Sequence, residues 1–224
     1  MDPIVKICGL STEETVEAAV AAGADMVGLV LFGRSPRQVT VARAAELARR
    51  ARGRAEIVAL TVDMDDGEMA AAVEAVRPDW LQLHGAESVE RVAAVREAFA
   101  VKVMKALSIA TSADLDRVAG YAAVSDRLLF DARPPKDADR PGGHGRMFDW
   151  RILAGFAPGV PWLVSGGLTP GNVAGALALS CADGVDVSSG VETAPGRKDR
   201  DLIRAFVAAA RGARVAPSAA RVAS

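Results

Sequence analysis

Residues 161–190 read PWLVSGGLTPGNVAGALALSCADGVDVSSG and contain one strand–turn–helix–strand unit of the predicted fold. An apolar run begins at Pro161, a glycine turn follows, and a helix-like segment over Pro170–Leu179 leads to a second apolar run from Gly184. The pair Thr169-Pro170 suits the start of this helix, because proline is tolerated in a first helical turn. Strands that are apolar along their length and joined by helices are typical of a parallel sheet covered on its outside by helices.

The same alternation recurs along the whole chain. Strand-like runs begin near eight positions, which are Ile4, Asp25, Ile57, Asp79, Val101, Arg127, Pro161 and Gly184. The helix-like segments are Thr12–Ala22, Val41–Ala51, Glu68–Val76, Ser88–Ala98, Ser112–Ala119, Pro170–Leu179 and Asp199–Arg211. Ser11 and Thr12 are candidate caps at the start of the first helix, and Gly23 is a candidate cap at its end. In a chain of 224 residues this pattern predicts an α/β protein with a single closed (β/α)8 TIM barrel, although periodicity alone also permits an open doubly wound sheet.

Composition supports one globular domain. We expect the barrel over residues 1–211 and a flexible tail over 212–224, because no linker or change of composition occurs before Gly212. With 27 Lys and Arg against 28 Asp and Glu, and aromatic residues at 4%, the chain lacks the basic or stacking surface of a nucleic-acid-binding protein. Neither a signal peptide nor an apolar run long enough to span a membrane is visible, so we expect a cytoplasmic protein without a membrane partner.

Glycines at the ends of the last two predicted strands indicate an anion site. SGGL includes Gly166 and Gly167, and SSG includes Ser189 and Gly190. Barrels often bind phosphate through backbone amides at these two strands, and glycine allows an amide to approach an anion closely. The alternative is that these glycines only form tight turns. A further cluster, GGHG at residues 142–145, is a candidate lid or additional amide donor.

Cys8 ends the first predicted strand and is either a small buried hydrophobic residue or a reactive group. Strand alternation places Ile4, Lys6 and Cys8 on one face. We expect Lys6 to pair with Asp186 on the neighbouring last strand, since an unpaired buried ammonium is costly. Such a cation near Cys8 favours the thiolate, which can accept a proton. Cys181 lies on the opposite rim, out of disulfide range, and is expected to be structural; the two cysteines have no metal-ligand spacing.

Two further side chains follow predicted strands. Asp131 ends the apolar run LLF and is either a candidate general acid or a loop cap. Arg37, in the second strand-to-helix loop, is either a solvated charge or a group whose planar fork suits a substrate carboxylate. The sequence gives His84 no specific role.

Seven segments together resemble one family: VKICGL, GLVLFGRSPRQV, LQLHG, LLFDA, GGHGRMFDW, LVSGGLTPGNV and GVDVSSGVETAPGRKD. In this order, from Val5 to Phe206, they resemble phosphoribosylanthranilate isomerase of tryptophan biosynthesis. The resemblance implies an enzyme of the aldose–ketose isomerase type (an intramolecular oxidoreductase) with a (β/α)8 barrel. It implies the Amadori rearrangement of N-(5-phosphoribosyl)anthranilate to 1-(2-carboxyphenylamino)-1-deoxyribulose 5-phosphate, with no metal or organic cofactor.

The resemblance also implies residue roles. Asp131 is the general acid that opens the ribose ring, and Cys8 is the general base that removes the proton from carbon 2. Arg37 matches the contact to the anthranilate carboxylate. Gly143, Gly166, Gly167, Ser189 and Gly190 match the loops that hold the phosphate. His144 stands where the family usually has Ser or Thr.

Two alternatives remain at this stage. The histidine-pathway isomerase that acts on a phosphoribosylformimino substrate has a similar fold and chemistry, but it uses an aspartate where this chain has Cys8. A non-catalytic phosphosugar-binding barrel would need the glycines but neither Cys8 nor Asp131. We expect a small-molecule phosphoribosyl substrate in either case, and a monomer or a homodimer.

Overall fold

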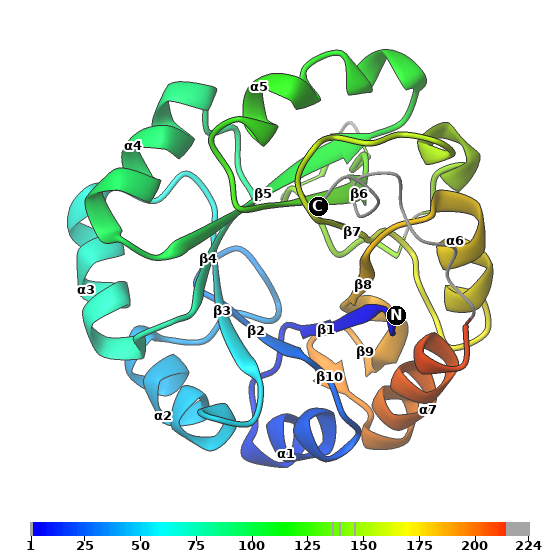
Figure 1. Ribbon diagram of the computed structural model, residues 1–224. Helices are drawn as coiled ribbons and strands as arrows, with labels where there is room; N and C mark the ends of the chain where they lie inside the picture. The colour runs from blue at the N-terminus through cyan, green and yellow to red at the C-terminus, as the bar shows by residue number, and fades with distance from the viewer. Residues whose placement is uncertain (1, 136, 139, 146, 214–224) are drawn as a thin grey trace.

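Eight parallel strands close into one barrel that is surrounded by helices (Figure 1). The computed structural model of the chain describes residues 2–135, 137–138, 140–145 and 147–213. The barrel strands are β1 (Ile4–Cys8), β2 (Met26–Val30), β3 (Glu56–Thr61), β4 (Trp80–Leu83), β5 (Lys102–Ile109), β6 (Arg127–Ala132), β7 (Trp162–Val164) and β8 (Gly184–Val187). Because β1 pairs with β8 as well as with β2, the predicted (β/α)8 barrel is confirmed and the open sheet is wrong.

Among the described residues an α-helix follows every barrel strand except β6, which is followed by a 3-10 turn, and the helices lie on the outside of the sheet. They are α1 (Glu13–Ala21), α2 (Val41–Ala51), α3 (Asp66–Val76), α4 (Val89–Phe99), α5 (Val118–Ala122), α6 (Val173–Ser180) and α7 (Arg200–Arg211). Short 3-10 turns are η1 (Ser112–Leu115), η2 (Trp150–Leu153) and η3 (Ser189–Val191), and a small hairpin comprises β9 (Glu192–Ala194) and β10 (Arg197–Lys198). Across the described residues, every helix is too short or too polar to cross a bilayer.

Most predicted boundaries agree with the structure, but two helices differ. The Thr12 side chain accepts the amide of Thr15 at 3.3 Å and caps α1, as expected. The helix predicted from Pro170 instead begins at Val173, because the Asn172 side chain accepts the amide of Thr169 at 2.7 Å and holds a turn ahead of the helix.

The single helix predicted over Ser112–Ala119 is divided into η1 and α5. Asp114 Oδ2 accepts the amides of Ala110 and Thr111, each at 2.8 Å, and this local capping favours a tight turn. The hairpin of β9 and β10 was not expected, because its strands are too short to show a periodic pattern.

The barrel interior changes from apolar to polar along its axis. At the amino-terminal end, an apolar layer is formed by Met26, Val58, Trp80, Met104, Ala106, Leu129 and Leu163. In the next layer, Lys6 is fully buried and its Nζ lies 2.7 Å from Asp186 Oδ1, so the predicted ion pair is confirmed. Cys8 stands above it at the carboxyl end, against Val30 and Leu60. This end therefore carries the polar groups of the interior.

The last helix joins the two ends of the described chain. Arg211 of α7 donates to the carbonyl oxygens of Pro3 and Gly23, and its Nη2 lies 2.7 Å from Asp25 Oδ2. These contacts lie at the amino-terminal rim, opposite Cys8. The predicted tail over 212–224 falls mostly on residues 214–224, which lie outside the described residues.

Candidate active site

An open pocket lies at the carboxyl ends of the strands, with about 760 Å³ of space including its mouth. Seven of the eight residues predicted for the site line it: Cys8, Arg37, Asp131, Gly143, Gly166, Gly167 and Ser189. Gly190 does not line the pocket. A Cβ on Gly190 would lie 1.7 Å from the Leu168 carbonyl oxygen, so this glycine lets η3 approach the loop after β7.

The thiol of Cys8 is nearly buried, with 4% of the residue exposed, at the base of the pocket. Burial raises the pKa of the Cys8 thiol, and the positive charges of Lys6 and Lys198 act against this shift without cancelling it. The predicted influence of Lys6 on the thiolate is therefore present, but desolvation outweighs it.

Gly28 of β2 shows how close the Lys6 charge comes to the thiol. A Cβ built on Gly28 would lie 2.9 Å from Cys8 Sγ and 3.2 Å from Lys6 Nζ, so the sulfur and the ammonium nitrogen both lie against this glycine. Burial by itself lowers the pKa of Lys6, but Asp186 and the thiol outweigh it and the pKa lies above its ordinary value. Lys6 is therefore an ammonium group beneath the thiol.

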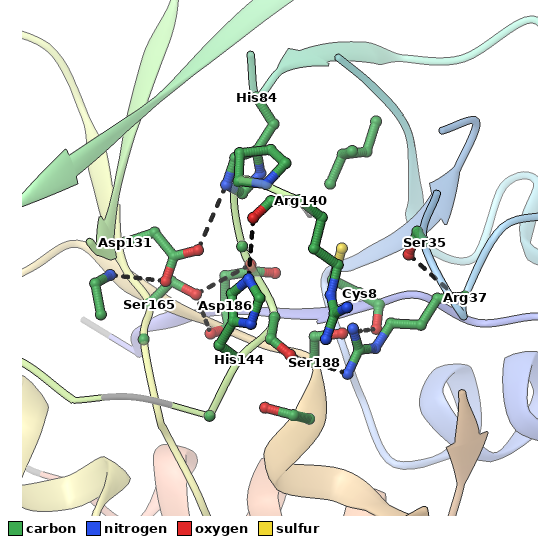
Figure 2. A pocket seen from close by; sticks show the side chains of 18 of the residues that line it. Cys8, Ser35, Arg37, His84, Asp131, Arg140, His144, Ser165, Asp186 and Ser188 are labelled. Carbon is green, nitrogen blue, oxygen red and sulfur yellow. Dashed lines mark hydrogen bonds and ion pairs between the residues drawn. The ribbon is translucent and has the colours of Figure 1, made fainter. Parts of the chain in front are cut away.

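Asp131 lies on β6 on the other side of the pocket, next to His84 (Figure 2). Its Oδ2 is 3.4 Å from His84 Nε2, and its Oδ1 accepts the amide of Ala132 at 2.8 Å. The Gln82 side-chain nitrogen is 2.9 Å from His84 Nδ1. With the amide donating to Nδ1, the ring carries its proton on Nε2, which faces Asp131.

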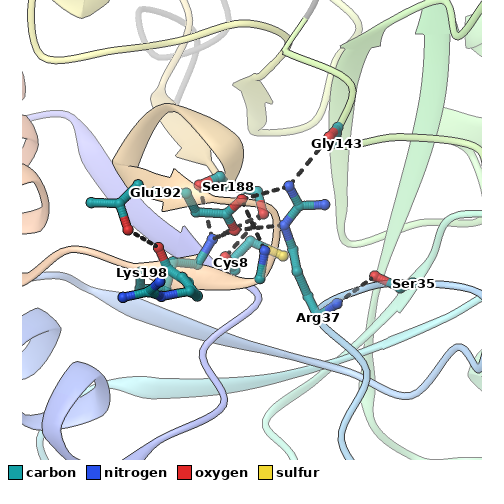
Figure 3. A network of polar contacts seen from close by, with 10 residues as sticks. Cys8, Ser35, Arg37, Gly143, Ser188, Glu192 and Lys198 are labelled. Carbon is teal, nitrogen blue, oxygen red and sulfur yellow. Dashed lines mark hydrogen bonds and ion pairs between the residues drawn. The ribbon is translucent and has the colours of Figure 1, made fainter.

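Arg37 is neither a solvated loop charge nor a free cation. It is 4% exposed, and the Glu192 carboxylate binds it through two hydrogen bonds, from Nε at 2.7 Å and from Nη2 at 2.8 Å. Nη2 also donates to the Gly143 carbonyl at 3.3 Å. Glu192 in turn accepts from Lys198 Nζ at 2.7 Å (Figure 3).

The glycines after β7 form the other end of the pocket. Gly166 has φ +87°, and a Cβ there would lie 2.7 Å from the Ala132 amide nitrogen, so only glycine fits without strain. Within the described residues, the amides of Gly166 and Gly167 have no backbone acceptor. These free donors and the start of η3 at Ser189 are an arrangement that can bind an anion.

The segment 140–145 lies across the pocket. A Cβ on Gly142 would be 2.7 Å from Asp131 Oδ2, and one on Gly143 would be 2.5 Å from Arg37 Nη1. His144 Nε2 bonds to the Arg140 carbonyl oxygen at 2.9 Å, so the imidazole closes a turn within the segment. The segment therefore lies against both the carboxylic acid and the arginine.

Two residues of this site, Glu192 and Lys198, were not among the candidates taken from the sequence. Both lie in GVETAPGRKD, a segment whose only signal in the sequence was its family resemblance, and their side chains are buried although both are charged. The signal available was the pair of opposite charges six residues apart, directly after the last strand. Gln82 and His84 lie at the end of a predicted strand, where functional groups were expected, but neither was assigned a role. Gln82 is on β4 and His84 follows the strand, so alternation along the chain places the two side chains on one face.

A closed (β/α)8 barrel with a thiol, a carboxyl group, an arginine and free glycine amides around one pocket at its carboxyl end is typical of enzymes that act on small anionic substrates. Residues 5–209 match the family model described as N-(5'phosphoribosyl)anthranilate (PRA) isomerase. The chain belongs to this family of isomerases, which confirms the family predicted from the sequence motifs.

Curated relatives agree over nearly the whole chain. N-(5'-phosphoribosyl)anthranilate isomerase of Afipia carboxidovorans is 63% identical over 217 residues, which are 97% of this chain and 93% of that protein. The protein of the same name from Rhodopseudomonas palustris strain BisA53 is 63% identical over 207 residues, covering 92% and 95%.

Solved structures have the same architecture. The phosphoribosylanthranilate isomerase of Thermotoga maritima superposes with a TM-score of 0.85 at 31% identity, covering 94% of this chain and 99% of that one. A phosphoribosylanthranilate isomerase in complex with reduced 1-(o-carboxyphenylamino)-1-deoxyribulose 5-phosphate has a TM-score of 0.82 at 29% identity, covering 94% and 99%.

Proposed function

We propose that this pocket carries out the Amadori rearrangement of N-(5-phosphoribosyl)anthranilate, with Asp131 as the general acid and Cys8 as the general base. The observation that carries the assignment is that these two side chains lie on opposite sides of one pocket (Figure 2). A sugar held between them would meet a proton donor on one face and a proton acceptor on the other.

In the first step, Asp131 donates its proton to the ribose ring oxygen. The bond from this oxygen to carbon 1 breaks, and the anthranilate nitrogen supplies an electron pair to form the iminium ion. His84 supports this step because its Nε2–H faces Asp131 Oδ2 and stabilises the carboxylate left after transfer.

Before the second step the Cys8 thiol loses its proton to solvent, and the thiolate then removes the proton from carbon 2. The electrons of the C–H bond form the carbon 1–carbon 2 double bond, and the iminium nitrogen becomes neutral. The resulting enolamine becomes the ketone when carbon 1 gains a proton and the carbon 2 hydroxyl loses one. Lys6, whose Nζ lies against Gly28 together with the Cys8 sulfur, stabilises the thiolate during this step.

The two ends of the substrate match the two ends of the pocket. Val30, Phe32, Leu60 and Val62 supply an apolar wall on the side of Arg37, which suits an aromatic ring whose carboxylate reaches the guanidinium. The free amides of Gly166 and Gly167, with Ser189, suit the phosphate at the other end. Gly143 lies in the loop over Arg37 and contacts this side chain, and Gly190 allows η3 to pack against the loop after β7.

The test is the fluorescence of substrate that is generated in situ from its precursors, which falls on addition of the purified chain. Cys8→Ser and Asp131→Asn are each expected to lower kcat by at least about 10²-fold, because each removes a proton-transfer group. Full activity in either variant would show that its role is misassigned. No turnover by the unaltered chain would favour a phosphosugar-binding barrel instead.

The cellular setting is part of the proposal. We expect the enzyme to act in the cytoplasm, on a small-molecule phosphoribosyl substrate, as a monomer or a homodimer. Light scattering coupled to size-exclusion chromatography measures the mass in solution and distinguishes the two oligomeric states.

A further inference from the structure

A buried group of three charged residues, Arg37, Glu192 and Lys198, lies beside the pocket (Figure 3). Their side chains are 5%, 3% and 1% exposed. Glu192 Oε1 accepts from both Arg37 Nε and Lys198 Nζ, each at 2.7 Å, while Oε2 accepts from Arg37 Nη2 at 2.8 Å. One carboxylate is thus shared by two cations in a region where desolvation makes each charge costly.

The contacts of Arg37 leave one edge of its guanidinium facing the pocket. Glu192 occupies the edge formed by Nε and Nη2, and the Gly143 carbonyl takes the remaining hydrogen of Nη2 at 3.3 Å. Within the described residues, Nη1 has no hydrogen-bond acceptor, and it lies beneath Gly143 of the segment that covers the pocket. A substrate carboxylate can bind the edge formed by Nη1 and Nη2 if it replaces the Gly143 carbonyl.

Lys198 connects the same carboxylate to the neighbourhood of Cys8. Its Nζ donates to the Ser188 carbonyl at 2.8 Å and lies 3.2 Å from Ser188 Oγ, and this hydroxyl donates to the Cys8 carbonyl at 3.2 Å. The attraction between Lys198 and the thiol lowers the pKa of Cys8 against the effect of burial. Lys6 is paired with a carboxylate of its own, Asp186, whereas Lys198 shares Glu192 with Arg37 and so leaves a net positive charge near the thiolate.

We propose that Glu192 is a positioning residue for two functions at once: it turns the free edge of Arg37 towards the substrate carboxylate, and it holds the Lys198 ammonium beside Cys8. The inference rests on the proposed function for the part that concerns Arg37, whereas the part that concerns Lys198 is tested without substrate. The competing explanation is that the three charges only fasten the hairpin of β9 and β10 to the barrel.

The first measurement separates substrate binding from turnover. Glu192→Gln keeps the shape of the side chain but removes the charge that orients Arg37, so we expect KM to rise at least about tenfold, with a smaller change in kcat. Glu13→Gln is the control, because Glu13 also binds an arginine through two hydrogen bonds, from Arg43 Nη1 and Nη2, each 2.6 Å long and away from the pocket. It is expected to leave KM within twofold.

The second measurement follows the thiol directly. Alkylation of Cys8 by iodoacetamide at pH 7.5 is quantified by peptide mass spectrometry, with Cys181 as the internal reference. Lys198→Met is expected to slow Cys8 alkylation at least about fivefold, and Lys198→Arg, which keeps the charge, is expected to restore most of the rate. Lys102→Met, which removes a lysine from a surface ion pair, is the control and leaves the rate unchanged.

The outcomes are distinguishable. Equal KM values in Glu192→Gln and Glu13→Gln, or an unchanged alkylation rate in Lys198→Met, would overturn the proposal and support the hairpin explanation. If Glu192→Gln does not fold, Glu192→Asp shortens the side chain and withdraws the carboxylate from Nε and Nη2 of Arg37, so KM is again expected to rise; an unchanged KM there would mean that this contact does not orient Arg37 and would contradict the proposal. If the unaltered chain shows no turnover while Lys198→Met still slows alkylation, the proposed function fails and the role of Lys198 stands.

Discussion

Cys8 illustrates how one residue is subject to opposing effects. Cys8 is the last residue of β1, so its sulfur lies at the base of the pocket. The burial that comes with this position disfavours the thiolate and raises the pKa of the thiol. Lys6 and Lys198 oppose this effect. The sequence predicted the Lys6–Asp186 pair from strand alternation, but it could not predict the sign of the net shift, because desolvation depends on the complete packing around the thiol.

A pH series tests this balance. Because the pKa of Cys8 is raised above its ordinary value of 9.0, the thiol is protonated at neutral pH and the thiolate increases with pH. Burial lowers the pKa of Lys198 to about 8, so this cation loses its charge over the same range, and we expect the rate of Cys8 alkylation to rise between pH 7 and pH 9 by less than the limit of about tenfold per pH unit. A rate that is constant over this range would mean that the thiolate is already formed, and that the two lysines outweigh burial.

At the scale of elements, the glycine turn after β7 was predicted from SGGL alone. Gly166 and Gly167 in this turn have positive φ angles, which favour glycine. The start of α6 was not predicted correctly, because Pro170 is compatible with a turn as well as with a first helical turn, and the side chain of Asn172 decides between them. Helix ends governed by one side-chain hydrogen bond are visible in the sequence only as several equivalent candidates.

Gly166→Ala tests the constraint on the turn. Gly166 and Gly53 both have positive φ, at +87° and +76°, so each alanine variant costs about 1–2 kcal/mol in backbone strain. Only Gly166 also has a close backbone neighbour, the Ala132 amide, whereas Gly53 has nothing within 4 Å. We expect Gly166→Ala to lower the free energy of unfolding further and to raise KM.

Denaturant unfolding and steady-state kinetics on the two variants provide the measurement. Gly53→Ala is the control for backbone strain alone and is expected to leave KM unchanged. Equal stability and equal KM in both variants would mean that the close contact at Gly166 relaxes at no cost.

The whole molecule is closed by the pairing of β1 with β8, which joins residues 180 positions apart in sequence. The periodicity of the sequence predicted the number of barrel strands. Strand alternation predicted the Lys6–Asp186 ion pair between the first and the last of them. The Arg37–Glu192–Lys198 group could not be predicted in the same way, because it depends on a hairpin of three and two residues folding back over the barrel mouth.

Removing one partner of the closing ion pair is expected to be costly. Lys6→Met leaves Asp186 buried without its cation and should reduce the free energy of unfolding by about 3–5 kcal/mol. The double variant Lys6→Met with Asp186→Asn removes both charges and should recover part of this loss, as measured by urea unfolding. A double variant less stable than Lys6→Met would mean that Asp186 has a separate structural role, for example through Ser165.

The contacts of Arg211 with Pro3 and Asp25 hold the first and last described segments together at the rim opposite the pocket. A short linker at this rim would join the two segments without passing over the pocket. Because the eight strands form a closed ring, new termini could then be placed between other strands. We expect a circular permutant opened at an exposed turn, such as the one at Gly53, to keep the barrel.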